Sequence, residues 1–114
     1  KIHKVTMITE VFFGIEDHGC MTCHLMLEGA DWGCDFGNYQ LEGETGAGMY
    51  AMHKLLDTFG VCDIDDLRNM PVRIQWNADS GSYRSLEAIG HIVKNKWFSW
   101  KDAFDEYEKE NKNG

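Results

Sequence analysis

The chain has 114 residues, 43% of them hydrophobic, which is the size and composition of one ordinary domain with one core. Its 11 Lys and Arg against 19 Asp and Glu give a net charge of −8. Such a charge repels nucleic-acid phosphates and attracts basic protein surfaces, so we expect no direct binding of DNA or RNA. No stretch approaches the ~20 apolar residues of a membrane span, and Lys1–Lys4 does not begin a signal peptide. We therefore expect a soluble intracellular protein.

The N-terminal part of the chain predicts a β-hairpin and a third strand. Lys4–Ile15 is rich in Val, Ile, Thr and Phe, and it ends at a turn in which Gly19 can supply a positive φ angle. Met21–Leu27 then alternates between two faces. One face carries Met21, Cys23, Leu25 and Leu27, and the other carries Thr22, His24 and Met26. Cys34–Leu41 predicts the third strand, weakened or bulged at Gly37.

The middle of the chain predicts a helix and another strand. From Gly46 to Phe59 the hydrophobic period becomes that of a helix, and Gly60 follows at the position of a left-handed C-terminal cap. We expect this helix to bury a stripe formed by Met49, Met52, Leu56 and Phe59. Asp63–Leu67 predicts a short helical turn, and Val72–Trp76 alternates as a strand does.

The C-terminal part predicts a second hairpin and an amphipathic helix. Asn77–Tyr83 is rich in turn formers, and Leu86–Val93 closes the hairpin. Ser99 and Asp102 form a capping box at the start of the helix. Its apolar stripe contains Trp100, Ala103, Phe104 and Tyr107.

This order of elements predicts the α+β class. Because the strands follow one another as hairpins, we expect an antiparallel sheet of four to five strands with two helices packed on one face. Residues 1–110 are expected to form a single domain, and residues 111–114 a frayed tail.

The cysteines of the chain are candidate zinc ligands. They are Cys20, Cys23, Cys34 and Cys62. The first two have the C-x-x-C spacing that lets two thiolates converge on one zinc ion at a hairpin turn, and the other two complete a set of four. A simple up-and-down path separates the pairs by most of a strand length, so other ligands stay open: His18, His24, His53 and His91. We favour a structural zinc ion over buried thiols and over disulfides, which a core of this size does not need.

Two patterns that suggest catalysis or a cofactor are unconvincing. Cys20–His24 has the C-x-x-C-H spelling of haem attachment, but it lies on a strand after a tight turn, and so short a match arises easily by chance. Asp17, His18 and Cys20 are the residue types of a nucleophile, a base and an orienting group, but neighbours on a turn point in different directions. We therefore expect no enzyme. The alternative is a small metal-dependent hydrolase or nuclease with Cys and His ligands and a nearby carboxylate.

Acidic residues gather in two regions, which suggests a partner-binding surface. The candidates for that surface are Asp63, Asp65 and Asp66 in the turn and Asp105, Glu106 and Glu108 in the last helix. If both groups faced one side, they would imitate a phosphate backbone and occupy a nucleic-acid channel of a partner protein. The alternative interpretation is two ordinary solvated surfaces.

Three stretches of the sequence are similar to those of a known family. They are Gly14-Ile-Glu-Asp-His-Gly19, Phe36-Gly-Asn-Tyr39 and Ala88-Ile-Gly-His-Ile-Val-Lys-Asn-Lys-Trp-Phe98. Together they span most of the chain and resemble a family of small bacteriophage and prophage proteins with no established reaction. The resemblance implies an α+β fold and a phage setting, in the cytoplasm of a bacterial host cell. The cysteines are not part of the shared pattern.

The phage setting suggests a kind of partner. Among phage and prophage accessory proteins, the anti-CRISPR inhibitors are the kind that suits a small acidic domain, and some inhibitors of Cas9 carry zinc. The resemblance therefore implies a protein that binds a host defence nuclease, a Cas9-type effector, through its acidic surface and prevents nucleic-acid binding. A structural or assembly protein of the phage particle is a further alternative.

Overall fold

The computed structural model describes residues 2–29, 33–38, 41, 46–76 and 86–111. One antiparallel sheet has six strands in the order β3-β2-β1-β4-β5-β6. The strands are β1 (Ile2–Ile15), β2 (Met21–Glu28), β3 (Gly33–Asn38), β4 (Met70–Trp76), β5 (Leu86–Gly90) and β6 (Trp97–Phe98). The helices are α1 (Ala47–Phe59), the 3-10 helix η1 (Ile64–Leu67) and α2 (Trp100–Asn111). The predicted α+β class is confirmed, with a sixth, short strand added to the sheet.

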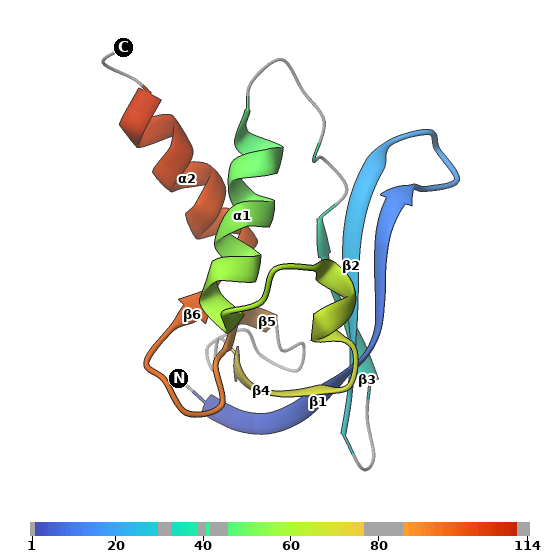
Figure 1. Cartoon of the computed structure of the whole chain (residues 1–114), viewed down its shortest axis with the longest axis vertical. Helices are drawn as coiled ribbons and strands as arrows, with labels where there is room; N and C mark the ends of the chain where they lie inside the picture. Colours follow the sequence, from blue (N-terminus) through green and yellow to red (C-terminus); the bar gives the residue numbers. More distant parts are fainter. Residues whose placement is uncertain (1, 30–32, 39–40, 42–45, 77–85, 112–114) are drawn as a thin grey trace.

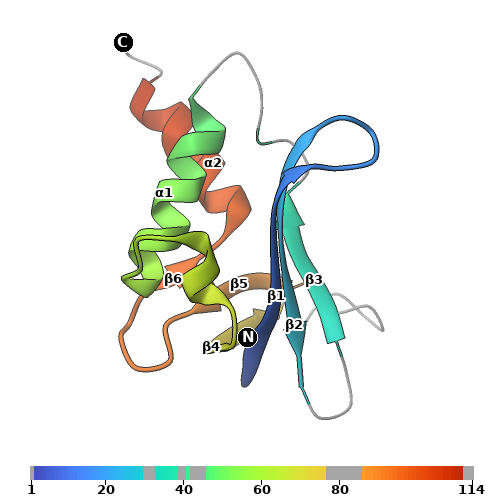
Figure 2. The same cartoon turned by 45° about the vertical axis from the view of Figure 1, so that its right-hand side comes forward.

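The sheet is strongly curled, and α1 and α2 lie side by side on one of its faces (Figures 1 and 2). The alternation predicted for β2 is confirmed, since Cys23, Leu25 and Leu27 have no exposed surface and belong to the core. The curl brings the β3 end of the sheet toward the β6 end. The ring of Phe36 in β3 accordingly lies 6.3 Å from that of Phe98 in β6. A closed core therefore forms between the curled sheet and the two helices.

The two neighbours of β1 pair with different parts of it. β4 pairs with Ile2–Ile8, and β2 pairs with Met7–Ile15. A β-bulge lies between Ile8 and Glu10, and such bulges increase the local twist of a strand. Glu10–Ile15 and the β2 segment opposite form a hairpin arm that stands away from the helices (Figure 1).

The helix α1 ends as predicted but buries a different stripe. Gly60 has a φ angle of 67° and caps the helix, as its position indicated. The expectation for Met49 was wrong, because its side chain is 68% exposed. Gly48, just before it, contacts the backbone of Leu41 so closely that a Cβ atom would not fit. Gly48 therefore faces inward and Met49 faces solvent. The buried face includes Ala51, Met52, Leu55 and Phe59, and the predicted Leu56 is partly buried against the core.

The second hairpin is shorter than predicted, since β5 ends at Gly90 and not at Val93. A Cβ atom at Gly90 would lie 2.6 Å from the Trp97 ring, so the indole of β6 covers the end of β5. Arg73 in β4 donates to the carbonyl oxygens of His91 and Lys94 at 2.8 and 2.9 Å and stabilises a loop in place of a longer strand. The loop predicted at Asn77–Tyr83 lies outside the described residues.

The C-terminal helix forms as its capping pattern predicts. The N–H of Asp102 donates to the Ser99 hydroxyl at 3.4 Å, and Trp100 and Ala103 are buried. α2 extends to Asn111, and residues 112–114 lie outside the described part. Within the described part, neither helix has the length and hydropathy needed to cross a membrane.

Candidate functional site

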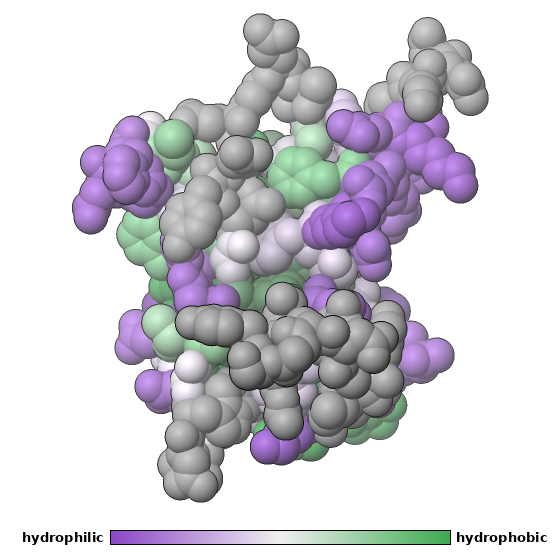
Figure 3. Space-filling model, turned by 180° about the vertical axis from the view of Figure 1, so that it is seen from behind, coloured by the Kyte–Doolittle hydropathy of each residue, from purple (hydrophilic) through white to green (hydrophobic). Residues whose placement is uncertain are grey.

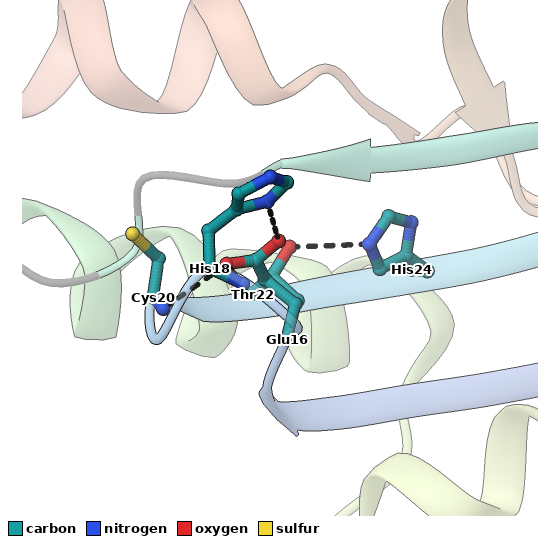
Figure 4. A network of polar contacts seen from close by, with 5 residues as sticks. All are labelled: Glu16, His18, Cys20, Thr22 and His24. Carbon is teal, nitrogen blue, oxygen red and sulfur yellow. Dashed lines mark hydrogen bonds and ion pairs between the residues drawn. The ribbon is translucent and has the colours of Figure 1, made fainter.

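Polar side chains of β2 and β3 meet around His24 on the outer face of the sheet. Its Nε2 lies 3.3 Å from the hydroxyl of Thr22 in β2 (Figure 4). Its Nδ1 lies 2.6 Å from Oδ2 of Asp35 in β3. With a neutral imidazole, Nδ1–H donates to the carboxylate and the Thr22 hydroxyl donates to Nε2. Both nitrogen atoms are therefore engaged, which holds the ring in one orientation.

The order of hydroxyl, imidazole and carboxylate has the connectivity of a nucleophile, a base and an orienting group. A nucleophile also has to reach its substrate. Thr22 has 0% exposed surface, whereas the side chain of His24 is 20% exposed. The hydroxyl is therefore closed to a substrate in this conformation, and the network acts as a positioning device for His24.

Gly37 provides the space in which the His24 ring lies. The two residues are directly opposite in the β2–β3 ladder, and a Cβ atom at Gly37 would lie 2.7 Å from Nδ1 of His24. The predicted bulge at Gly37 is wrong, since the register of β3 continues without a shift through this position. Gly37 instead allows the neighbouring strand to approach closely, which is a common role of a glycine inside a strand.

Glu16 organises the turn of the β1–β2 hairpin. Its Oε1 accepts hydrogen bonds from the backbone N–H groups of His18 and Cys20 at 2.7 and 3.1 Å, and its Oε2 lies 2.8 Å from Nδ1 of His18 (Figure 4). The hydrogen bond from His18 is the main reason why the pKa of Glu16 is lowered. Gly19 has a φ angle of 84°, as the turn required. Because His18 pairs with Glu16, the structure does not assemble Asp17, His18 and Cys20 as a catalytic group.

The four predicted zinc ligands do not meet in the structure. Cys23 is buried in the core, whereas Cys62 is exposed beyond the end of α1. Cys23 pairs with Asn38, and Cys34 lies four residues away along β3, a separation of about 13 Å at the rise of a strand. Within the described ranges, no three His, Cys, Asp or Glu side chains are grouped to hold a metal ion. A zinc ion needs its sulfur ligands at about 2.3 Å, so these four residues do not fit a shared zinc site in this arrangement.

The predicted acidic group around η1 is largely used in local contacts. The Asp63 carboxylate accepts from the N–H of Asp65 at 2.8 Å and caps η1. Asp65 in turn lies 3.3 Å from Arg68. The third residue of this group, Asp66, is exposed. This group therefore stabilises the end of the α1–β4 connection.

The acidic group of α2 occupies a separate surface. Asp105 lies 2.7 Å from Lys101, and Glu106 lies 3.1 Å from Lys54 in α1. Tyr107 reaches Gly46 at the start of α1, whereas η1 follows the other end of that helix. The structure thus does not merge the two acidic groups into one face.

The sequence did not predict the contact between His24 and Asp35. The alternation placed Thr22 and His24 on one face, but the partner in β3 depends on the register of two strands joined by a loop. No protein-family model matches the sequence, and no curated protein or solved structure is significantly similar to it.

Proposed function

We propose that this protein acts by binding and not by catalysis, as a phage-encoded inhibitor of a host defence nuclease of the Cas9 type. The proposal is supported by the outward face of α2, which carries five exposed carboxylates and two exposed lysines. These carboxylates belong to Asp102, Asp105, Glu106, Glu108 and Glu110. Figure 3 shows hydrophilic surface on the side of the molecule where α2 lies.

The carboxylates of α2 lie on a helix that several contacts hold in place. Trp100 and Ala103 are buried, and the Tyr107 hydroxyl accepts a hydrogen bond from the N–H of Gly46 at 3.1 Å. The rings of Tyr50 and Tyr107 lie 5.5 Å apart and join the two helices. A rigid array loses little conformational entropy on binding, so its charges act with little reorganisation.

The charge of this face suits a basic nucleic-acid channel. Hydrogen bonds from Tyr50 and Lys54 lower the pKa of Glu106, so this carboxylate is ionised at neutral pH. Channels that hold a guide–target duplex contact its phosphates through positively charged side chains. A helix with a net excess of carboxylates can take the place of phosphates in such a channel, with electrostatic steering toward it.

Charge reversal on α2 tests the proposal. We expect the triple variant Asp105→Lys, Glu106→Lys and Glu108→Lys to lose binding to a purified Cas9–guide RNA complex, because it replaces attraction by repulsion. The matched control is Asp17→Lys, Glu28→Lys and Asp66→Lys, which changes exposed acids outside the α2 surface by the same total charge. The measurement is the dissociation constant at low and at high salt, with circular dichroism to verify folding.

The salt dependence of binding and the control variant together test whether the charges of α2 cause the binding. Unmodified protein should bind at least about tenfold more weakly at high salt, since salt screens contacts between exposed charges. The control should bind as the unmodified protein does. Affinity that is independent of salt, equal losses in both triple variants or no binding at all would contradict this function for the α2 surface.

A further inference from the structure

One side of β1 is an open sheet edge in the hairpin arm. Pairing with β4 ends at Ile8, whereas pairing with β2 continues to Ile15. Among the described residues, no strand pairs with Glu10–Ile15 on the side away from β2. Figure 1 shows β1 as the outer strand of the arm. Backbone N–H and C=O groups on such an edge are free to form a ladder with another strand.

The open edge is unusually apolar for a surface strand. Phe12, Phe13 and Ile15 are 45%, 41% and 69% exposed. Proteins commonly protect an edge with Lys or Pro, and Val11–Ile15 has neither. Figure 3 shows apolar surface on the side where the arm stands, below its hydrophilic turn.

The exposed side chains on the two faces of the arm differ in their contacts. On the outer face, the Phe12 ring lies 3.3 Å from the Cβ position of Gly14 and 6.2 Å from the His24 ring. On the inner face, Phe13 and Ile15 are opposite Cys23 and Met21 in the ladder, and both remain exposed. Alternate side chains of an added strand would pack beside Phe13 and Ile15, as in strand-addition complexes.

Charges at both ends of the edge indicate what kind of strand fits. Glu10 begins the segment with a side chain that is 74% exposed and 3.4 Å from Arg68, and exposed Asp17 follows its end. A second copy of this chain fits poorly. An antiparallel two-fold pairing would place the Glu10 end of one copy beside the Asp17 end of the other, and like charges close to one another destabilise a sheet.

We propose that an extended segment of a partner protein adds to the sheet along Glu10–Ile15 as a further strand, with alternating apolar residues and Lys or Arg at its ends. Backbone hydrogen bonds supply the pairing, Phe13 and Ile15 supply apolar contacts, and the acidic ends select basic flanks. This surface is separate from the α2 face and does not depend on its function.

The probe is the capped peptide Lys-Val-Thr-Val-Thr-Val-Lys, added to the full chain while amide hydrogen exchange is followed by NMR. We expect slower exchange at alternate amides of Val11–Ile15, since successive N–H groups of a strand point to opposite sides. A peptide with Pro at the central Val should bind at least about tenfold more weakly, because Pro lacks a ladder donor.

Two matched variants localise the effect. Ile15→Lys should abolish the protection. Phe13→Lys should abolish it as well, and it serves as the test if Ile15→Lys folds poorly. Met49→Lys changes a side chain of similar exposure, 68%, on α1 and should leave binding intact. The α2 triple variant should also bind the peptide, which separates a failure here from a failure of the proposed function.

Several outcomes would overturn the assignment. No change of exchange in Glu10–Ile15 at saturating peptide, or an equal loss in Met49→Lys, excludes strand addition at this edge. Protection of the same amides without peptide, together with a concentration-dependent dimer, assigns the edge to a second copy of the chain and contradicts a basic partner strand.

Discussion

At the scale of single residues, Gly37 determines where the imidazole of the neighbouring strand lies. A methyl group at this position would be 2.7 Å from Nδ1 of His24 and 2.9 Å from the Cys23 carbonyl oxygen. Either the ring or the strand would have to move, and both are held by other contacts. The hydrogen bond between His24 and Asp35 thus depends on a residue that takes no part in it.

We expect Gly37→Ala to lower the free energy of unfolding by about 2 kcal/mol, the usual range for overpacking. Gly33→Ala is the control in the same strand, since its Cβ would meet its nearest atom, the Leu27 carbonyl oxygen, at 3.5 Å. That variant should stay within about 0.5 kcal/mol of the unmodified protein. Urea unfolding measures both, and equal costs would show that the close contact is not the cause.

Cys23 is a core residue whose thiol is costly to ionise. Burial raises its pKa from 9.0 to about 12, and the negative charge of Asp35 adds to the effect. A zinc ligand has to be a thiolate, so this environment suits a buried thiol. Burial raises the pKa of Cys34 in the same direction.

The pKa of Cys23 predicts a loss of stability at alkaline pH. Between pH 9.0 and about 12, the unfolded chain releases the thiol proton and the folded chain keeps it. The free energy of unfolding should then fall by about 1 kcal/mol per pH unit, and it should be unaffected by this group below that range. Urea unfolding at about pH 8 and about pH 10.5 measures the fall.

Cysteine variants test whether Cys23 causes this fall in the free energy of unfolding. Cys23→Ala should show a smaller fall, with the remainder from Cys34 and other groups. The exposed Cys62 provides the control, and Cys62→Ala should keep the full pH dependence. An unchanged fall in Cys23→Ala would show that burial of this thiol is not responsible.

At the scale of elements, α1 and α2 depend on one another. α1 begins after Gly46, which has no side chain to cap the helix, and the Tyr107 hydroxyl of α2 accepts from its N–H at 3.1 Å. The ion pair between Lys54 and Glu106 joins the same two helices, but both partners are exposed and it contributes little. The capping contact is therefore the more important polar link between the helices.

We expect Tyr107→Phe to lower the free energy of unfolding by about 1 kcal/mol, because the substitution removes this bond and retains the ring. Tyr50→Phe is the control, since it removes a hydroxyl that contacts Glu106 at the surface. Its cost should be below about 0.5 kcal/mol. Thermal or urea unfolding compares the two, and equal costs would contradict a capping role for Tyr107.

At the scale of the whole molecule, the curl of the sheet creates two surfaces of different character. The helices cover the inner face and present the acidic side of α2 to solvent. The same curl takes β4 away from β1 after Ile8 and leaves the hairpin arm with an open edge. The α2 surface is therefore suited to electrostatic binding, and the edge of the hairpin arm is suited to strand pairing.

The sequence by itself determined the parts of the fold that depend on near neighbours. The β2 alternation, the Gly60 cap and the Ser99 cap were all predicted, because periodicity and turn chemistry are local properties. The α+β class followed from the order of these elements. At the candidate site, only the shared face of Thr22 and His24 was predictable.

Only the tertiary structure decided which distant groups meet. The contact of His24 with Asp35, the outward position of Met49 and the separation of the cysteines depend on strand register and on close backbone packing. Such contacts join residues far apart in the chain, and a shift of one residue in register moves a side chain to the other face. No local pattern contains that information, and the open edge of β1 likewise results from where β4 stops pairing.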